Sequence, residues 1–138
     1  SVTKKSNIKL IFIQEDLSHI FEINAALARN ELVVITGDRY VKGSKYLTAD
    51  LLNQLAKFPA GPFMLASRLS VPVLFVYVMK ETNTHYHLFT RQAKAKHRDA
   101  QALLKEYVSS VTWMLNKNPF QWFNYFDFWE TLNEKNQK

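Results

Sequence analysis

The chain has 138 residues, of which 47% are hydrophobic and 22% charged, a composition typical of one globular domain that excludes global disorder. It has no cysteine, which excludes disulfide scaffolds, Cys-ligated zinc and thiol nucleophiles. The longest uninterrupted apolar run, residues 71–79, is too short to supply the ~20 residues that cross a bilayer. The net charge of +6 favours phosphate-bearing partners: nucleic acid, an anionic membrane surface or phosphorylated small molecules.

The first third of the chain predicts a strand, a helix and a second strand. Residues 8–13 are apolar and β-branched, which is typical of a buried strand. Asp16 is a candidate N-cap for a helix over 17–28, whose apolar residues fall on one face. Residues 31–36 contain the run Leu-Val-Val-Ile, which favours a strand covered on both faces. The Gly-Asp-Arg sequence at 37–39 is expected to end that strand.

The remaining elements alternate between helices and strands. We expect a short helix over 50–55, a helix beginning at Gly61-Pro62, a strand over 71–79 paired antiparallel with 85–90, a helix over 99–116 and a second helix over 119–130. This alternation predicts an α/β fold in which one mixed sheet is flanked by helices.

Residues 1–138 are expected to form a single domain or a fragment of one, with a polar tail over about 132–138. The chain opens at Ser1 without a methionine and without a signal segment, which we interpret as the mark of a cleaved or cut piece.

The four histidines do not predict a metal site. His19 lies three residues before Glu22, a spacing found in carboxylate-bridged metal sites, but no second motif of this kind accompanies it. His85 and His87 face the same side of one strand, and nothing nearby supplies a third ligand. His97 lies in a basic run. We therefore interpret all four as surface or half-buried side chains.

A phosphate-binding region is predicted where the second strand ends. Asp38 lies at the carboxyl end of a strand, where α/β sheets place ligand contacts, and the Arg39 guanidinium can clamp a phosphate. The alternative is that both residues pair with other structural elements. The helix expected at Gly61 would offer peptide N–H groups to an anion. The basic residues that could form a rim around it are Arg39, Lys42, Lys45 and Lys57.

Seven aromatic residues lie among the eleven positions 119–129. A helix that is aromatic all round cannot be an ordinary surface helix. We expect about half of these side chains to pack in the core and the others to lie at a membrane interface. Trp122, Phe126 and Trp129 are the candidates for membrane contact or packing.

Four sequence blocks in this order resemble a known family. They are Gly-Asp-Arg at 37–39, Phe-Pro-Ala-Gly-Pro-Phe-Met-Leu-Ala at 58–66, Val-Pro-Val-Leu at 71–74, and Asn118-Pro119 followed by Gln-Trp-Phe-Asn at 121–124. The chain is similar, over roughly residues 16–129, to the C-terminal half of bacterial lipid A biosynthesis acyltransferases. These enzymes form a branch of the lysophospholipid-acyltransferase-like superfamily.

The resemblance implies the C-terminal part of a glycerolipid acyltransferase-like fold. The implied enzyme moves a fatty acyl chain from acyl carrier protein or coenzyme A to a lipid acceptor, lipid A or a related membrane lipid. It would act as a peripheral protein at the cytoplasmic face of the bacterial inner membrane and use no cofactor besides the acyl thioester. The residues implied to line the phosphate region of donor or acceptor are Asp38, Arg39, Lys42, Lys57, Phe58, Pro59 and Gly61.

One departure from the family concerns catalysis. The family's general base is a His followed five positions later by Asp or Glu. None of the four histidines here has an acid at that position: Asn24, Thr90, Gln92 and Ala102 stand there instead. We therefore expect no catalytic residue in this chain, an inactive fragment, and a catalytic half elsewhere in the full-length protein. A family member that has lost catalysis remains an alternative.

Two further alternatives stay open. The first is a non-catalytic basic module for nucleic acid, which we disfavour because the aromatics are not interleaved with basic residues on a strand and because no aromatic lies in 91–98. The second is a peripheral module for an anionic membrane surface. A divided α/β sheet would also expose a strand edge, from which we expect self-association.

Overall fold

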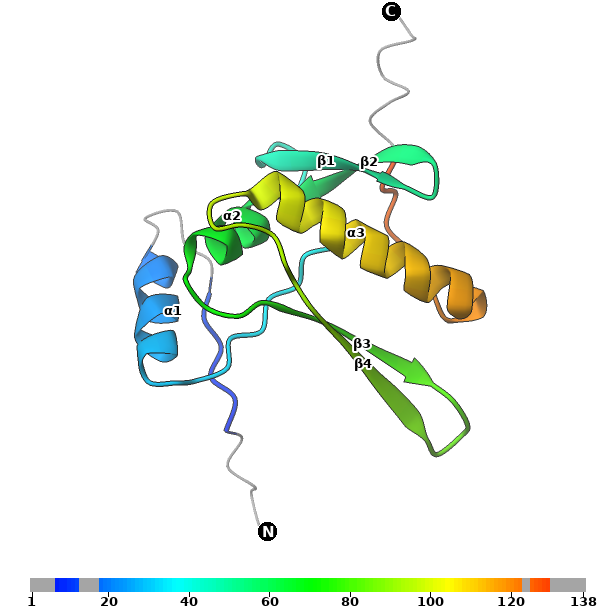
Figure 1. The fold of residues 1–138 in the computed structure, drawn as a ribbon, viewed down its shortest axis with the longest axis horizontal. Helices are drawn as coiled ribbons and strands as arrows, with labels where there is room; N and C mark the ends of the chain where they lie inside the picture. The colour runs from blue at the N-terminus through cyan, green and yellow to red at the C-terminus, as the bar shows by residue number, and fades with distance from the viewer. Residues whose placement is uncertain (1–6, 13–17, 123–124, 130–138) are drawn as a thin grey trace, which may run out of the picture. The chain divides into compact units, whose positions relative to one another are not determined.

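The computed structural model describes residues 7–12, 18–122 and 125–129. The chain forms two compact units, Ser1–Ile35 and Thr36–Lys138. The first contains α1 (Ser18–Ala28), and the second contains the remaining helices and strands in chain order (Figure 1).

Helix α1 confirms the helix expected in the first unit. Its Ile23 and Ala26 are buried, and Lys9 forms an ion pair with Glu22 (Nζ–Oε2 3.3 Å). The proposed N-cap, Asp16, lies outside the described residues.

The two strands predicted beside this helix are not formed in the described residues. Residues 8–12 and 31–36 have no strand assignment, and Leu32 and Val34 are among the exposed apolar side chains. An apolar run becomes a strand only where a neighbouring strand takes its peptide hydrogen bonds, and neither run takes part in a ladder here.

Strands β1 (Tyr46–Leu51) and β2 (Gln54–Pro59) form an antiparallel hairpin where a short helix over 50–55 was predicted. The predicted helix is wrong because Leu52 and Asn53 adopt positive φ angles of 55° and 65°, the backbone of a type I′ turn. The Asn53 N–H donates to Asp50 Oδ1 at 2.9 Å. The register pairs Ala49 with Ala56, and both are buried.

The helices α2 (Ala60–Arg68) and α3 (Ala100–Lys117) begin where the sequence predicts. Helix α2 follows β2 without a loop, with Pro59 as its N-cap. Helix α3 begins after Asp99, whose side chain accepts a hydrogen bond from the Ala102 N–H at 2.8 Å. Figure 1 shows α3 running between the two hairpins of this unit, with α2 beside its first turns.

Strands β3 (Leu74–Lys80) and β4 (Tyr86–Gln92) confirm the second expected hairpin. The two hairpins form separate two-stranded antiparallel sheets. The α/β class is therefore confirmed, whereas the single mixed sheet is wrong for the described part of the chain. Its parallel strands would have come from runs 8–13 and 31–36, which form no ladder in the described residues.

The aromatic C-terminal segment differs from the predicted helix over 119–130. Only a 3-10 turn, η1 (Pro119–Gln121), forms among its described residues. Instead the chain lies across the core, where Phe128 is 5% exposed and Phe126 packs against it (ring centroids 4.9 Å). The tail over 132–138 lies outside the described residues.

Candidate functional site

The segment 37–40 is held at the junction of β2 and α2. A Cβ added at Gly37 would lie only 3.2 Å from Cζ of Phe63, a buried residue in the first turn of α2. A residue with a side chain could take this place only if the Phe63 ring moved. Glycine at position 37 therefore lets the main chain lie directly on the ring.

Tyr40 holds the other end of the segment. Its ring contacts those of Tyr46 (5.9 Å between centroids) and Phe126 (6.2 Å). The Lys57 ammonium lies 4.4 Å from the centroid of Tyr46 and 5.9 Å from that of Tyr40. The two tyrosines thus fix the position of this cation through cation–π attraction.

Asp38 and Arg39 lie between these two anchors and face solvent. The Arg39 Nε is 3.4 Å from Asp38 Oδ2, and their side chains are 61% and 44% exposed. An ion pair this exposed is weak, so an incoming anion can compete with Asp38 for the guanidinium. The two residues pair with each other.

Tyr107 of α3 lies beneath the segment. Its ring contacts those of Phe58, Phe63 and Phe75 at centroid distances of 5.4–6.3 Å. Burial raises the pKa of the Tyr107 hydroxyl well above its usual range, and the negative charges of Tyr77 and Asp38 add to the rise. The proximity of Tyr107 to Asp38 carries no local sequence signal, and sequence reasoning missed it.

The residues predicted around the start of α2 have different environments. Phe58 is 1% exposed and belongs to the core, and Pro59 forms the last pair of the β1–β2 ladder with Tyr46. The Ala60 N–H already donates to the Lys45 carbonyl at 3.0 Å. A Cβ at Gly61 would meet nothing within 4 Å, so this peptide is the open part of the helix start.

The remaining predicted basic residue, Lys42, lies in the turn that follows Tyr40. This turn is closed by the Ser44 N–H, which donates to the Val41 carbonyl at 2.9 Å. Lys57 lies beside Tyr40, the residue that follows Arg39 in the chain. The structure places Lys42 and Lys45 in the loop between Tyr40 and β1.

Trp122, Phe126 and Trp129 pack on the core and on one another. Trp122 contacts Phe128 (6.0 Å) and Trp129 (6.4 Å). Among the described aromatic residues of this segment, Phe120 and Tyr125 face solvent and are 94% and 90% exposed.

A second cluster of basic and aromatic side chains joins β4 to α3. Arg91 lies 4.4 Å from the ring centroid of Trp113, and the Lys117 ammonium lies 4.7 Å from that of Phe89. His87 stacks on Phe89 with a centroid distance of 4.6 Å and an interplanar angle of 18°. We call these five residues the β4–α3 cluster. Sequence reasoning missed it, although basic and aromatic residues alternate at 87, 89 and 91.

Other features of the described chain lie away from these residues. A shallow depression of about 280 Å³ lies at the far end of α2, lined in part by Ser67, Val71, Lys96 and His97, and no predicted site residue lines it. Across residues 7–12, 18–122 and 125–129, no group of three or more His, Asp or Glu side chains is placed to ligate a metal. None of the described helices is long and apolar enough to span a membrane.

A scan against protein-family models, a search of curated proteins and a search of solved structures each found no match to this chain.

Proposed function

We propose that this chain is the substrate-binding part of a membrane-associated lipid acyltransferase. The full-length protein would move a fatty acyl chain from acyl carrier protein or coenzyme A to lipid A or a related membrane lipid, as a peripheral protein at the cytoplasmic face of the inner membrane. The order of the four sequence blocks supports this function.

The observation that carries the proposal is the contact between two of those blocks. Gly37 lies on the ring of Phe63, so the Gly-Asp-Arg block touches the block that begins at Phe58. Because Tyr40 packs beside Lys57, the main chain that carries Arg39 is held at both ends, by Gly37 and by Tyr40. We propose that Arg39 binds the substrate phosphate, with Lys57 beside Tyr40 and the Gly61 N–H as further contacts.

In the proposed reaction, a hydroxyl or amine of the acceptor attacks the thioester carbonyl. A C–O or C–N bond forms, the C–S bond breaks, the thiolate leaves, and a general base takes the acceptor's proton. The 138 residues contain no His with an acid five positions later, so we place that base outside this chain and propose that the chain alone is inactive. The role of this part is to bind and position phosphate-bearing substrate.

Acyl transfer by the full-length protein tests the proposal. Arg39→Gln should raise the KM for the phosphate-bearing substrate, whereas Arg29→Gln should leave it unchanged. Arg29 is the matched control because it too forms an exposed ion pair with a nearby acid, Glu31 (2.6 Å). Absence of acyl transfer by the wild-type full-length protein would refute the proposed function.

The β4–α3 cluster favours a second function, a non-catalytic module for nucleic acid or an anionic membrane surface. It interleaves basic and aromatic side chains on a strand face, the arrangement that single-stranded nucleic acid binding uses. Nucleic acid binding would weaken steeply with salt and would be lost in Arg91→Gln and Lys117→Gln but kept in Arg39→Gln.

A further inference from the structure

The outer edge of β3 carries peptide groups that no strand of the described residues covers. Two hydrogen bonds fix the direction of every peptide in this hairpin: the Glu81 N–H donates to the His85 carbonyl, and the Ala93 N–H donates to the Val73 carbonyl, both at 2.9 Å. Hydrogen-bonded pairs alternate along an antiparallel ladder. The N–H and C=O groups of the alternate residues 74, 76, 78 and 80 therefore point away from β4.

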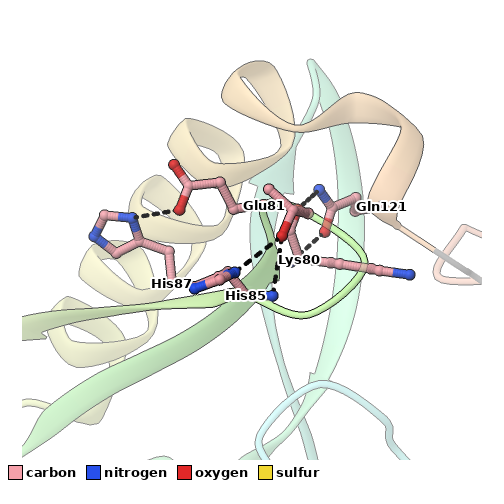
Figure 2. A network of polar contacts seen from close by, with 6 residues as sticks. Lys80, Glu81, His85, His87 and Gln121 are labelled. Atoms are coloured by element: carbon pink, nitrogen blue, oxygen red, sulfur yellow. Dashed lines mark hydrogen bonds and ion pairs between the residues drawn. The ribbon is translucent and has the colours of Figure 1, made fainter.

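One of these four residues shows what the edge accepts. The Lys80 N–H donates to Oε1 of Gln121 and the Lys80 carbonyl accepts from Nε2 of the same side chain, both at 2.7 Å. Figure 2 shows the Gln121 amide facing the Lys80 main chain. This amide takes both bonds as a peptide of a neighbouring strand would. Among the described residues, nothing takes the corresponding groups of Leu74, Val76 and Val78.

The side chains along this edge are apolar and exposed. Leu74, Val76 and Val78 point to one face of the hairpin, where Val76 is 54% exposed and Leu88 of β4 is 60% exposed. Free peptide groups beside exposed β-branched side chains are the features to which an added strand binds.

Two features select a second copy of β3 as the occupant. In an antiparallel pair centred on Val76, Leu74 faces Val78 of the second copy, and each such pair exchanges two hydrogen bonds. The next position pairs Lys80 with Pro72. The Lys80 peptide groups already bond to Gln121, and Pro72 has no N–H to donate. No further hydrogen bond therefore forms at this position, and the ladder between the two copies stops there at both of its ends.

Charge distinguishes β3 from β4 as the pairing edge. A β3 pair brings only apolar and aromatic side chains together around its centre, and the two Lys80 residues lie at opposite ends. A β4 pair would bring His87 and Arg91 of one copy close to those of the other. Like charges across a strand pair are destabilising.

We propose that the chain forms a two-fold dimer in which β3 pairs antiparallel with β3 of a second copy, giving a four-stranded sheet in the order β4-β3-β3-β4. This interface does not depend on the proposed acyltransferase function. It replaces the unpaired edge with an isologous contact.

Sedimentation velocity over a concentration series, with Val76→Lys and Leu88→Lys as a matched pair, tests the dimer. Both substitutions place a lysine on the same exposed face of the hairpin, but only the first lies at the two-fold axis. Val76→Lys should raise the dimer dissociation constant by at least about tenfold, while Leu88→Lys should leave it within about twofold. Circular dichroism and the urea midpoint verify that each variant is folded.

Disulfide trapping supplies an independent readout because the chain has no cysteine of its own. Val76→Cys should oxidise to a covalent dimer, since the two Cα atoms would lie about 5.5 Å apart, within disulfide reach. Leu88→Cys should form no covalent dimer under the same conditions, because Leu88 lies away from the two-fold axis. A wild-type chain that sediments as a monomer at all concentrations, or equal effects of the two lysine variants, would overturn the proposal.

Discussion

Phe128 is the described residue of the aromatic C-terminal segment that is buried in the core, and its truncation should lower the denaturant concentration at which the protein unfolds. The side chain is 5% exposed and its ring lies 5.7 Å from that of Phe58 and 4.9 Å from that of Phe126. Its carbonyl accepts a hydrogen bond from the Lys57 N–H at 3.4 Å, which alanine would keep. Phe128→Ala therefore isolates the contribution of the ring.

The expected loss is large relative to the whole stability. Removal of a buried phenylalanine side chain costs about 3–5 kcal/mol, of a total free energy of unfolding of about 5–15 kcal/mol. With a urea m-value of about 1.5 kcal/mol/M, the midpoint should fall by about 2–3 M. Phe120→Ala is the control, because Phe120 is 94% exposed and its truncation should change stability by less than about 0.5 kcal/mol.

Urea unfolding followed by tryptophan fluorescence measures both variants, since the chain has three tryptophans. Vesicle binding at the same protein concentration separates packing from membrane contact. If Phe128→Ala shifted the midpoint no more than Phe120→Ala and lost vesicle binding instead, the ring would lie in a membrane interface and the reasoning from burial would be refuted.

Three other predictions follow from single side chains. Tyr77→Phe should leave the free energy of unfolding unchanged or raise it by up to about 1 kcal/mol in urea titrations, because the buried Tyr77 hydroxyl has no hydrogen bond of good geometry in the described chain. The folded state raises the pKa of Tyr107, so the free energy of unfolding should be constant below the unfolded pKa of about 10 and fall as pH rises above it. Urea midpoints measured between pH 8 and 11 should show a weaker pH dependence in Tyr107→Phe than in the wild type. Gly37→Val should destabilise by about 1–3 kcal/mol by forcing a branched side chain against Phe63, whereas Gly61→Ala, in open space, should not destabilise; thermal unfolding compares the two. A Gly37→Val variant as stable as the wild type would show that Phe63 yields freely, and a Tyr77→Phe variant several kcal/mol less stable would show a missed hydrogen bond.

Elements with their signals close together in sequence were predicted well. The helix α3 follows its Asp99 cap, α2 begins at Gly61-Pro62 within one residue, and β3 and β4 flank a short polar turn. Elements whose hydrogen-bonding partners lie far away in the sequence were predicted poorly. Residues 31–36 have the composition of a strand, but they take part in no ladder among the described residues.

The hairpin β1–β2 and the aromatic segment show two other limits of local reasoning. Leu52 adopts a positive φ angle that leucine rarely takes, so its residue type does not indicate a turn; the paired strands on either side hold this conformation. The aromatic segment was expected to be helical. Instead, its chain takes an irregular path that packs the Phe128 ring against Phe58 in the core.

The candidate site was predictable in part. The resemblance placed Asp38 and Arg39 near the block at 58–66, and Gly37 does lie on Phe63. The β4–α3 cluster was not foreseen because Arg91 and Trp113 are distant in sequence, and only the packing of α3 on the hairpin brings them together.

Direct binding of a phosphate-bearing lipid tests the central claim most simply. The dissociation constant of dihexanoyl phosphatidic acid, which is soluble as a monomer, would be measured for the wild-type chain, Arg39→Gln and Arg29→Gln by titration calorimetry. Arg39→Gln should weaken binding by about tenfold or more, because it removes a charge-assisted contact to phosphate, and Arg29→Gln should bind as the wild type does. Equal affinities of wild type and Arg39→Gln, or equal losses in both variants, would contradict a phosphate site at the Gly-Asp-Arg segment.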